Sequence, residues 1–120
     1  MRAGRFSIIV WMAAFFAGLG MASAESWSPD TALVAKVEKE LVLPRSSKPL
    51  KEYKRYYFGI LSGKERILGA VFVYKEGEAG ALIVKEAEAP QILDGGCGVI
   101  HLKYDVDGQK VISLFCNGEA

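Results

Sequence analysis

Residues 53–74 have the sequence YKRYYFGILSGKERILGAVFVY, and this stretch decides the fold. Its first third alternates, so that Tyr53, Arg55 and Tyr57 share one face of an extended chain. A polar, glycine-containing turn then leads into residues 67–74, which are apolar on both faces, as is typical of a central strand. The stretch therefore predicts two strands of a sheet joined by a short turn.

Two further segments downstream extend the predicted sheet. Residues 76–80 turn the chain into a third strand at 81–85, which predicts an antiparallel meander of three consecutive strands. After a long irregular stretch, residues 99–106 and 110–116 form the clearest hairpin in the chain. The sequence thus predicts five strands, of which four or five form one sheet.

The turn of this hairpin fixes an expected register. Asp105 and Gly108 occupy the first and fourth positions that a type I turn prefers, and Gly108 supplies a left-handed bulge residue. The resulting pairs are Asp105 with Gln109, Ile100 with Leu114, Leu102 with Ile112, and Gly98 with Cys116.

Upstream of the strands, the sequence predicts one amphipathic helix over residues 29–42. Ser28 is the expected N-cap, Pro29 suits the first helical position, and Pro44 ends the helix. One apolar stripe recurs at helical spacing and consists of Leu33, Val34, Val37 and Leu41. Such a helix needs a sheet on which to bury that stripe.

These elements predict an α+β domain, in which one N-terminal helix packs on an antiparallel sheet of four or five strands. The expected layout is similar to that of the cystatins in the order of its elements only. None of the inhibitory motif residues of that family is found in this sequence.

The first 24 residues are predicted to be a secretory signal peptide. Arg2 and Arg5 precede an apolar run at 6–19, and the small residues Ala22 and Ala24 mark a cleavage site after Ala24. An uncleaved anchor is the alternative, but Glu25 follows at once without a basic flank. We therefore expect a single small domain at 25–120, exported to a periplasm or the extracellular space, with no membrane span after cleavage.

The charge of this domain argues against nucleic acid as a partner. Arg2 and Arg5 are two of the fifteen basic residues, so residues 25–120 keep thirteen basic residues against fourteen acidic ones, a net charge of −1. Nucleic-acid binding calls for a strongly basic surface.

The two cysteines, Cys97 and Cys116, are predicted to form a disulfide, because an exported chain folds under oxidising conditions. Two free thiols or half of a metal site are the alternatives. Neither is favoured, since His101 is the only histidine, and no cofactor or metal is predicted. Closing a loop of this length should contribute about 3 kcal/mol.

His101 is the candidate for a general base. Asp94 or Asp105 could orient its ring, but no motif places a nucleophile beside it. The preferred interpretation is a histidine on the sheet surface, and no enzymatic activity is predicted.

The expected function is that of a small binding or inhibitor-type module whose partner is a protein of the envelope or extracellular space. A single helix covers one face of a sheet, and the uncovered face is expected to carry the polar and amphipathic strand residues. The candidate binding residues are Tyr53, Arg55, Tyr57 and His101 on that face, with Asp94, Gly95 and Gly96 in a glycine-rich loop.

Two alternatives remain beside this expectation. The glycine-rich loop has a purely structural interpretation, since a disulfide at the start of a strand needs flexible backbone geometry. The chain could also be a small-ligand carrier, with a pocket between helix and sheet lined by Tyr57, Val71 and Leu102.

Overall fold

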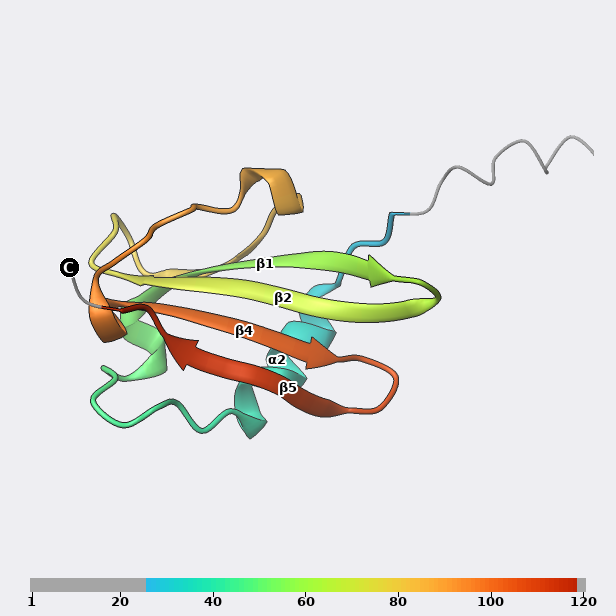
Figure 1. Ribbon diagram of the computed structural model, residues 1–120, viewed down its shortest axis with the longest axis horizontal. Coiled ribbons are helices and arrows are strands. Elements are labelled where there is room, and N and C mark those ends of the chain that lie inside the picture. The colour runs from blue at the N-terminus through green and yellow to red at the C-terminus, as the bar shows by residue number, and fades with distance from the viewer. Residues whose placement is uncertain (1–25, 119–120) are drawn as a thin grey trace, which may run out of the picture.

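The computed structural model describes residues 26–118, which form an α+β domain with one α-helix packed on a five-stranded, mostly antiparallel mixed sheet (Figure 1). The predicted signal peptide and its cleavage after Ala24 lie outside the described residues. In this part of the chain, no helix is long and apolar enough to cross a membrane.

Helix α2 spans Thr31–Glu40, which is shorter than the predicted range of 29–42 and does not lie at the N-terminus of the chain. The predicted cap was wrong, because the carboxylate of Asp30 accepts a 2.8 Å hydrogen bond from the backbone N–H of Leu33. Leu41 is already extended (φ −74°, ψ 135°), three residues before Pro44.

The sheet has the strand order β3-β1-β2-β4-β5. Strands β1 (Tyr53–Ser62) and β2 (Glu65–Tyr74) form an antiparallel hairpin, as predicted, with a two-residue turn between Ser62 and Glu65. Strand β4 (Val99–Asp105) pairs antiparallel with β2, and β5 (Lys110–Cys116) pairs antiparallel with β4. Short 3-10 turns occupy Leu50–Glu52 (η3), Glu86–Glu88 (η4) and Gly96–Gly98 (η5).

The predicted antiparallel meander is wrong at its third strand. Strand β3 (Gly80–Ile83) lies at the edge of the sheet beside β1 and runs parallel to it. Strand β3 cannot pair with β2, because β1 and β4 occupy the two edges of β2. Residues 75–79 therefore lead the chain to the outer edge of β1. Lys75 and Gly77 in this connection adopt left-handed φ values of 60° and 63°. The similarity to the cystatin order therefore does not extend to this strand.

The predicted disulfide between Cys97 and Cys116 is confirmed, with a Cα–Cα distance of 4.6 Å. Cys97 lies in η5, just before β4 begins.

The predicted hairpin register was wrong by one residue beside the turn, where Asp105 pairs with Lys110, and by two residues beyond the irregularity at Lys103. Ile100 pairs with Cys116 and Leu102 with Leu114, because the left-handed residue is Gln109 (φ 55°) and the strands are irregular beside Lys103.

The helix covers one face of the sheet, which we call the helix face, and the main core lies between them. Its buried members are Val34, Val37, Tyr53, Tyr57, Leu68, Ala70, Phe72, Ile100, Leu102 and Tyr104. The opposite face, here the open face, carries Phe58, Val71, Val73 and Val99, with His101, Lys103 and Phe115 further along β4 and β5. Residues 84–92 cover only part of it, through Val84, Ala89 and Ile92.

Candidate functional site

The three candidate binding residues of β1 lie on the helix face, so their predicted assignment to the uncovered face was wrong. Tyr53 and Tyr57 are fully buried, and Arg55 is 6% exposed. The register explains the error. Arg55 pairs with Phe72, and Phe72 pairs with Ile100, so these paired side chains lie on the same side of the sheet as the buried residues of β4. These side chains are therefore part of the core beneath α2.

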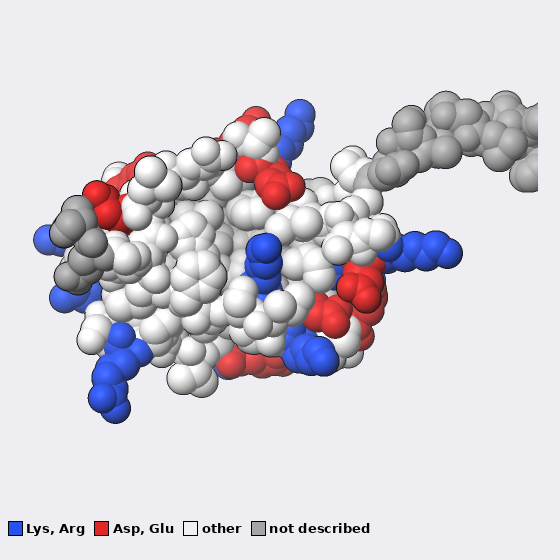
Figure 2. Space-filling view, in the orientation of Figure 1, with Lys and Arg blue, Asp and Glu red and all other residues white. Residues whose placement is uncertain are grey.

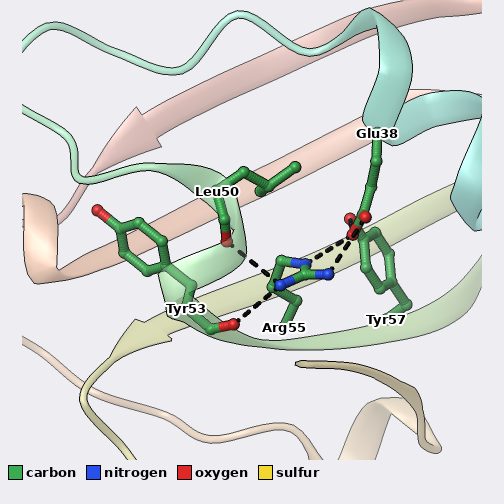
Figure 3. A network of polar contacts seen from close by, with 5 residues as sticks. All are labelled: Glu38, Leu50, Tyr53, Arg55 and Tyr57. Atoms are coloured by element: carbon green, nitrogen blue, oxygen red, sulfur yellow. Dashed lines mark hydrogen bonds and ion pairs between the residues drawn. The ribbon is translucent and has the colours of Figure 1, made fainter. Parts of the chain in front are cut away.

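Arg55 and Tyr57 converge on Glu38 of the helix and form a cluster, here the Glu38 cluster (Figure 3). Glu38 Oε2 accepts a hydrogen bond of 2.7 Å from Arg55 Nε and another of 2.7 Å from the Tyr57 hydroxyl. Glu38 Oε1 has a longer contact, 3.3 Å, with Arg55 Nη2. Only 7% of the Arg55 side chain and 15% of the Glu38 side chain are exposed, so the ion pair is nearly withdrawn from water.

Backbone carbonyls complete the coordination of Arg55. Its Nη1 donates to the carbonyl oxygens of Leu50, at 3.2 Å, and Tyr53, at 3.1 Å (Figure 3). A buried charge is tolerated only when it is paired and hydrogen-bonded in this way. The cluster therefore fixes α2 and η3 to the start of β1.

The environment of the Glu38 cluster holds Tyr57 in its neutral form. Burial raises the pKa of Tyr57 well above its ordinary value, and the hydrogen bond to Glu38 and its negative charge raise it further. Tyr57 therefore keeps its hydroxyl proton and donates it in the hydrogen bond to Glu38. The hydroxyl oxygen can still accept a hydrogen bond.

Sequence reasoning did not single out Glu38, which was grouped with the polar residues of the helix. One signal could have found it. Glu38 follows Val34 by four residues and Val37 by one, so it adjoins the buried stripe of α2. A carboxylate at that position needs a cation from the sheet, and Arg55 supplies it.

A groove runs beside the Glu38 cluster, between α2 and the edge strand β3. Its volume is about 380 Å³, and its lining comprises Thr31, Val34, Ala35, Glu38, Tyr57, Ala81, Leu82 and Ile83. Of the residues predicted to line a carrier's pocket, only Tyr57 contributes to this groove. Leu102 is packed in the core, and Val71 lies on the opposite face.

His101 lies on the open face, as predicted, and is partly buried. Its ring stacks on Phe115, with 5.3 Å between centroids and an interplanar angle of 21°. Its Nε2 lies 2.7 Å from Asn117 Oδ1. Because Asn117 Nδ2 donates to the carbonyl oxygens of Ile92 and Asp94, the Asn117 oxygen is the acceptor and His101 Nε2 carries the proton. An amide, and neither Asp94 nor Asp105, is therefore the partner of this nitrogen.

The rest of the open face is apolar and only partly covered. The ring of Phe58 lies across Gly69, where a Cβ would collide with it. Two shallow grooves flank this ring, and Phe58, Val71 and His101 line both of them. Phe115 is 51% exposed. Figure 2, which looks onto this face, shows a broad uncharged area with most charged side chains around its edge.

The glycine-rich loop uses its backbone for internal contacts. Gly95 and Gly96 adopt left-handed φ values of 107° and 55°, which favour glycine. The N–H of Gly96 donates to the carbonyl of Gly118, and the N–H of Gly98 donates to Gly95. These bonds support the structural interpretation, while contact of Asp94, Gly95 and Gly96 with a partner stays a prediction.

Among residues 26–118, no group of three or more His, Cys, Asp or Glu side chains is arranged to hold a metal ion. No protein-family model, curated protein or solved structure matches this chain.

Proposed function

We propose that this chain is a small exported binding module that engages a protein partner through the open face of its sheet. The observation that carries the proposal is the half-exposed side chain of Phe115, which stacks on His101 on the open face. Aromatic residues in such settings commonly anchor protein interfaces.

The packing of the molecule also supports a binding surface here. Residues 84–92 reach over Phe58, Val71 and Val73 but leave the β4–β5 side of the face uncovered. Contiguous apolar surface of this kind, surrounded by charged residues, marks interaction sites in soluble domains. Asn117 ties the covering segment to the sheet through the carbonyls of Ile92 and Asp94, so the surface would lose little entropy on binding.

The proposal of export rests on two features that agree with one another. The predicted signal peptide would direct the chain out of the cytoplasm, and the Cys97–Cys116 disulfide suits an oxidising compartment. Intact-mass measurement of the exported protein tests this directly: a chain beginning at Glu25 is expected, and a membrane-bound species retaining residues 1–24 would contradict it.

Photo-crosslinking tests the open face. A photoreactive phenylalanine analogue placed at Phe115 should crosslink to a discrete partner in envelope or culture extract. The same analogue at Val42, which is 85% exposed but lies next to the C-terminal end of α2, is the matched control. Phe115→Arg should abolish co-purification of the crosslinked partner, whereas Val42→Arg should not. Equal crosslinking from both positions would place the interface elsewhere.

A small-ligand carrier is the second candidate function. The observation that favours it is the groove between α2 and β3, whose volume of about 380 Å³ matches that of small-molecule sites. This groove lies on the helix face and is independent of Phe115.

A further inference from the structure

The groove between α2 and β3 is open because its two walls carry small side chains. Ala35 on the helix and Ala81 on the strand both line it and both remain exposed. Val34, Leu82 and Ile83 supply most of the remaining apolar lining. A ligand in the groove would therefore be held mainly by apolar contact.

The groove also has a polar part, formed by Glu38 and Tyr57. The hydroxyl of Tyr57 donates its single proton to Glu38 Oε2, so its oxygen can only accept a further hydrogen bond. Among residues 26–118, Glu38 Oε1 has only the 3.3 Å contact with Arg55, so it retains acceptor capacity. Because Tyr57 is fully buried and Glu38 is partly exposed, Glu38 Oε1 is the acceptor that a ligand can reach.

The charge of this polar part is balanced within the protein. Arg55 lies 2.7 Å from Glu38 and offsets its negative charge, so a cationic ligand would find no unpaired counter-charge. A carboxylate ligand would face the Glu38 carboxylate and would be repelled. A neutral group with an O–H or N–H is the chemistry that fits.

The buried ion pair itself has a function in this arrangement. Burial of an ion pair is weak evidence for a stabilising role, since apolar residues of similar volume often stabilise as well or better. Here Arg55 holds Glu38 in one orientation, with Oε2 engaged and Oε1 freer. The pair thereby presents a fixed acceptor at an apolar groove.

We infer that the groove between α2 and β3 binds a small, uncharged, largely apolar molecule that donates one hydrogen bond to Glu38. This inference rests on the second candidate function, that of a small-ligand carrier. The ligand class is that of phenols, alcohols and secondary amides with a compact apolar body.

Three matched probes test the donor requirement: 4-ethylphenol, 4-ethylanisole and 4-ethylbenzoate. The first donates a hydrogen bond, the second has the same ring with its donor methylated, and the third carries a charge. Binding is followed by NMR, from amide shifts of Ala81, Leu82 and Ile83. The phenol should bind at least about tenfold more tightly than the anisole, because a hydrogen bond to a charged acceptor is lost. The benzoate should not bind measurably.

Two helix variants test the location. Ala35→Leu fills the groove, and Ala32→Leu adds the same side chain at an exposed position of α2 that does not line it. Alanine and leucine are both strong helix formers, so both variants should fold. The phenol should lose binding to Ala35→Leu and keep it with Ala32→Leu.

The possible outcomes separate the inference from the function beneath it. Equal binding of phenol and anisole, lost together in Ala35→Leu, would overturn the donor requirement and leave the carrier function standing. Unchanged phenol binding to Ala35→Leu would overturn the location. Absence of binding by every probe to the wild-type protein would overturn both.

Discussion

The two faces of the sheet are covered in different ways. On the helix face, α2 buries a continuous core and an ion pair of which one member comes from the helix and the other from β1. On the open face, residues 84–92 cover one side and leave Phe115 half exposed. Substitutions on the helix face should therefore cost mainly stability, and substitutions on the open face should cost mainly binding.

The largest effect is expected from breaking the Glu38 cluster. Arg55→Met should lower the free energy of unfolding by about 3–5 kcal/mol, because it leaves the Glu38 carboxylate buried without its counter-charge. Urea unfolding of the purified protein measures this loss.

A double variant identifies the cause. Glu38→Gln combined with Arg55→Met removes both charges and keeps an oxygen to accept the Tyr57 hydroxyl. It should regain much of the stability that Arg55→Met loses. If the double variant is as unstable as the single one, packing of the arginine rather than charge accounts for the loss.

The next largest effect is expected from the disulfide, which connects the two faces. Cys97 follows the segment that covers the open face, and Cys116 packs against the helix-face core. Cys97→Ala combined with Cys116→Ala should lower stability by about 2–5 kcal/mol. The wild type should lose a similar amount in reductant, whereas the double variant should not respond to it. Alkylatable thiols in the freshly isolated wild type would contradict the bridge.

A smaller effect is expected from Tyr57→Phe, which removes one hydrogen bond within the Glu38 cluster. At neutral pH the loss should be about 1 kcal/mol, a typical value for an intramolecular hydrogen bond.

The same variant has a distinctive pH dependence. The pKa of Tyr57 is higher in the folded chain than in the unfolded one, so its contribution to stability is fully present below about pH 10 and is lost as the pH rises further. The urea midpoint of Tyr57→Phe should therefore fall less steeply above this pH than that of the wild type. Tyr104, whose pKa burial also raises, contributes equally to both. Parallel curves would show that Tyr57 ionises freely in the folded protein.

Much of the fold followed from local patterns in the sequence. Alternation and turn residues located β1, β2, β4 and β5, and the apolar spacing located the helix. The third strand was found, but its partner was not, since four small and apolar residues carry no information about which edge of the sheet they join. The position of β3 depends on β4, a strand farther along the chain, which pairs with the edge of β2 that β3 would otherwise occupy.

The candidate site was predicted less well, because tyrosine and arginine are amphipathic. The polar ends of Tyr53, Arg55 and Tyr57 are compatible with an uncovered face of the sheet. Their apolar parts are equally compatible with a buried core. Only the register from β1 through β2 to β4 assigns them to the helix face. The partner of Arg55 is separated from it by 17 residues, so no local pattern could pair them.

The smallest effect is expected at an exposed ion pair between the start of β2 and the turn that joins β4 to β5. Arg66 and Asp107 are 2.7 Å apart, the same distance as Arg55 and Glu38, but about half of each side chain is exposed (48% and 58%). Arg66 lowers the pKa of Asp107, yet water and salt screen an exposed pair. Asp107→Asn is the cleaner variant, because Arg66 also lies over the ring of Trp27. Its urea midpoint should match that of the wild type within error at neutral pH. A loss comparable to that of Arg55→Met would show that contact distance, rather than burial, sets the cost of breaking an ion pair in this protein.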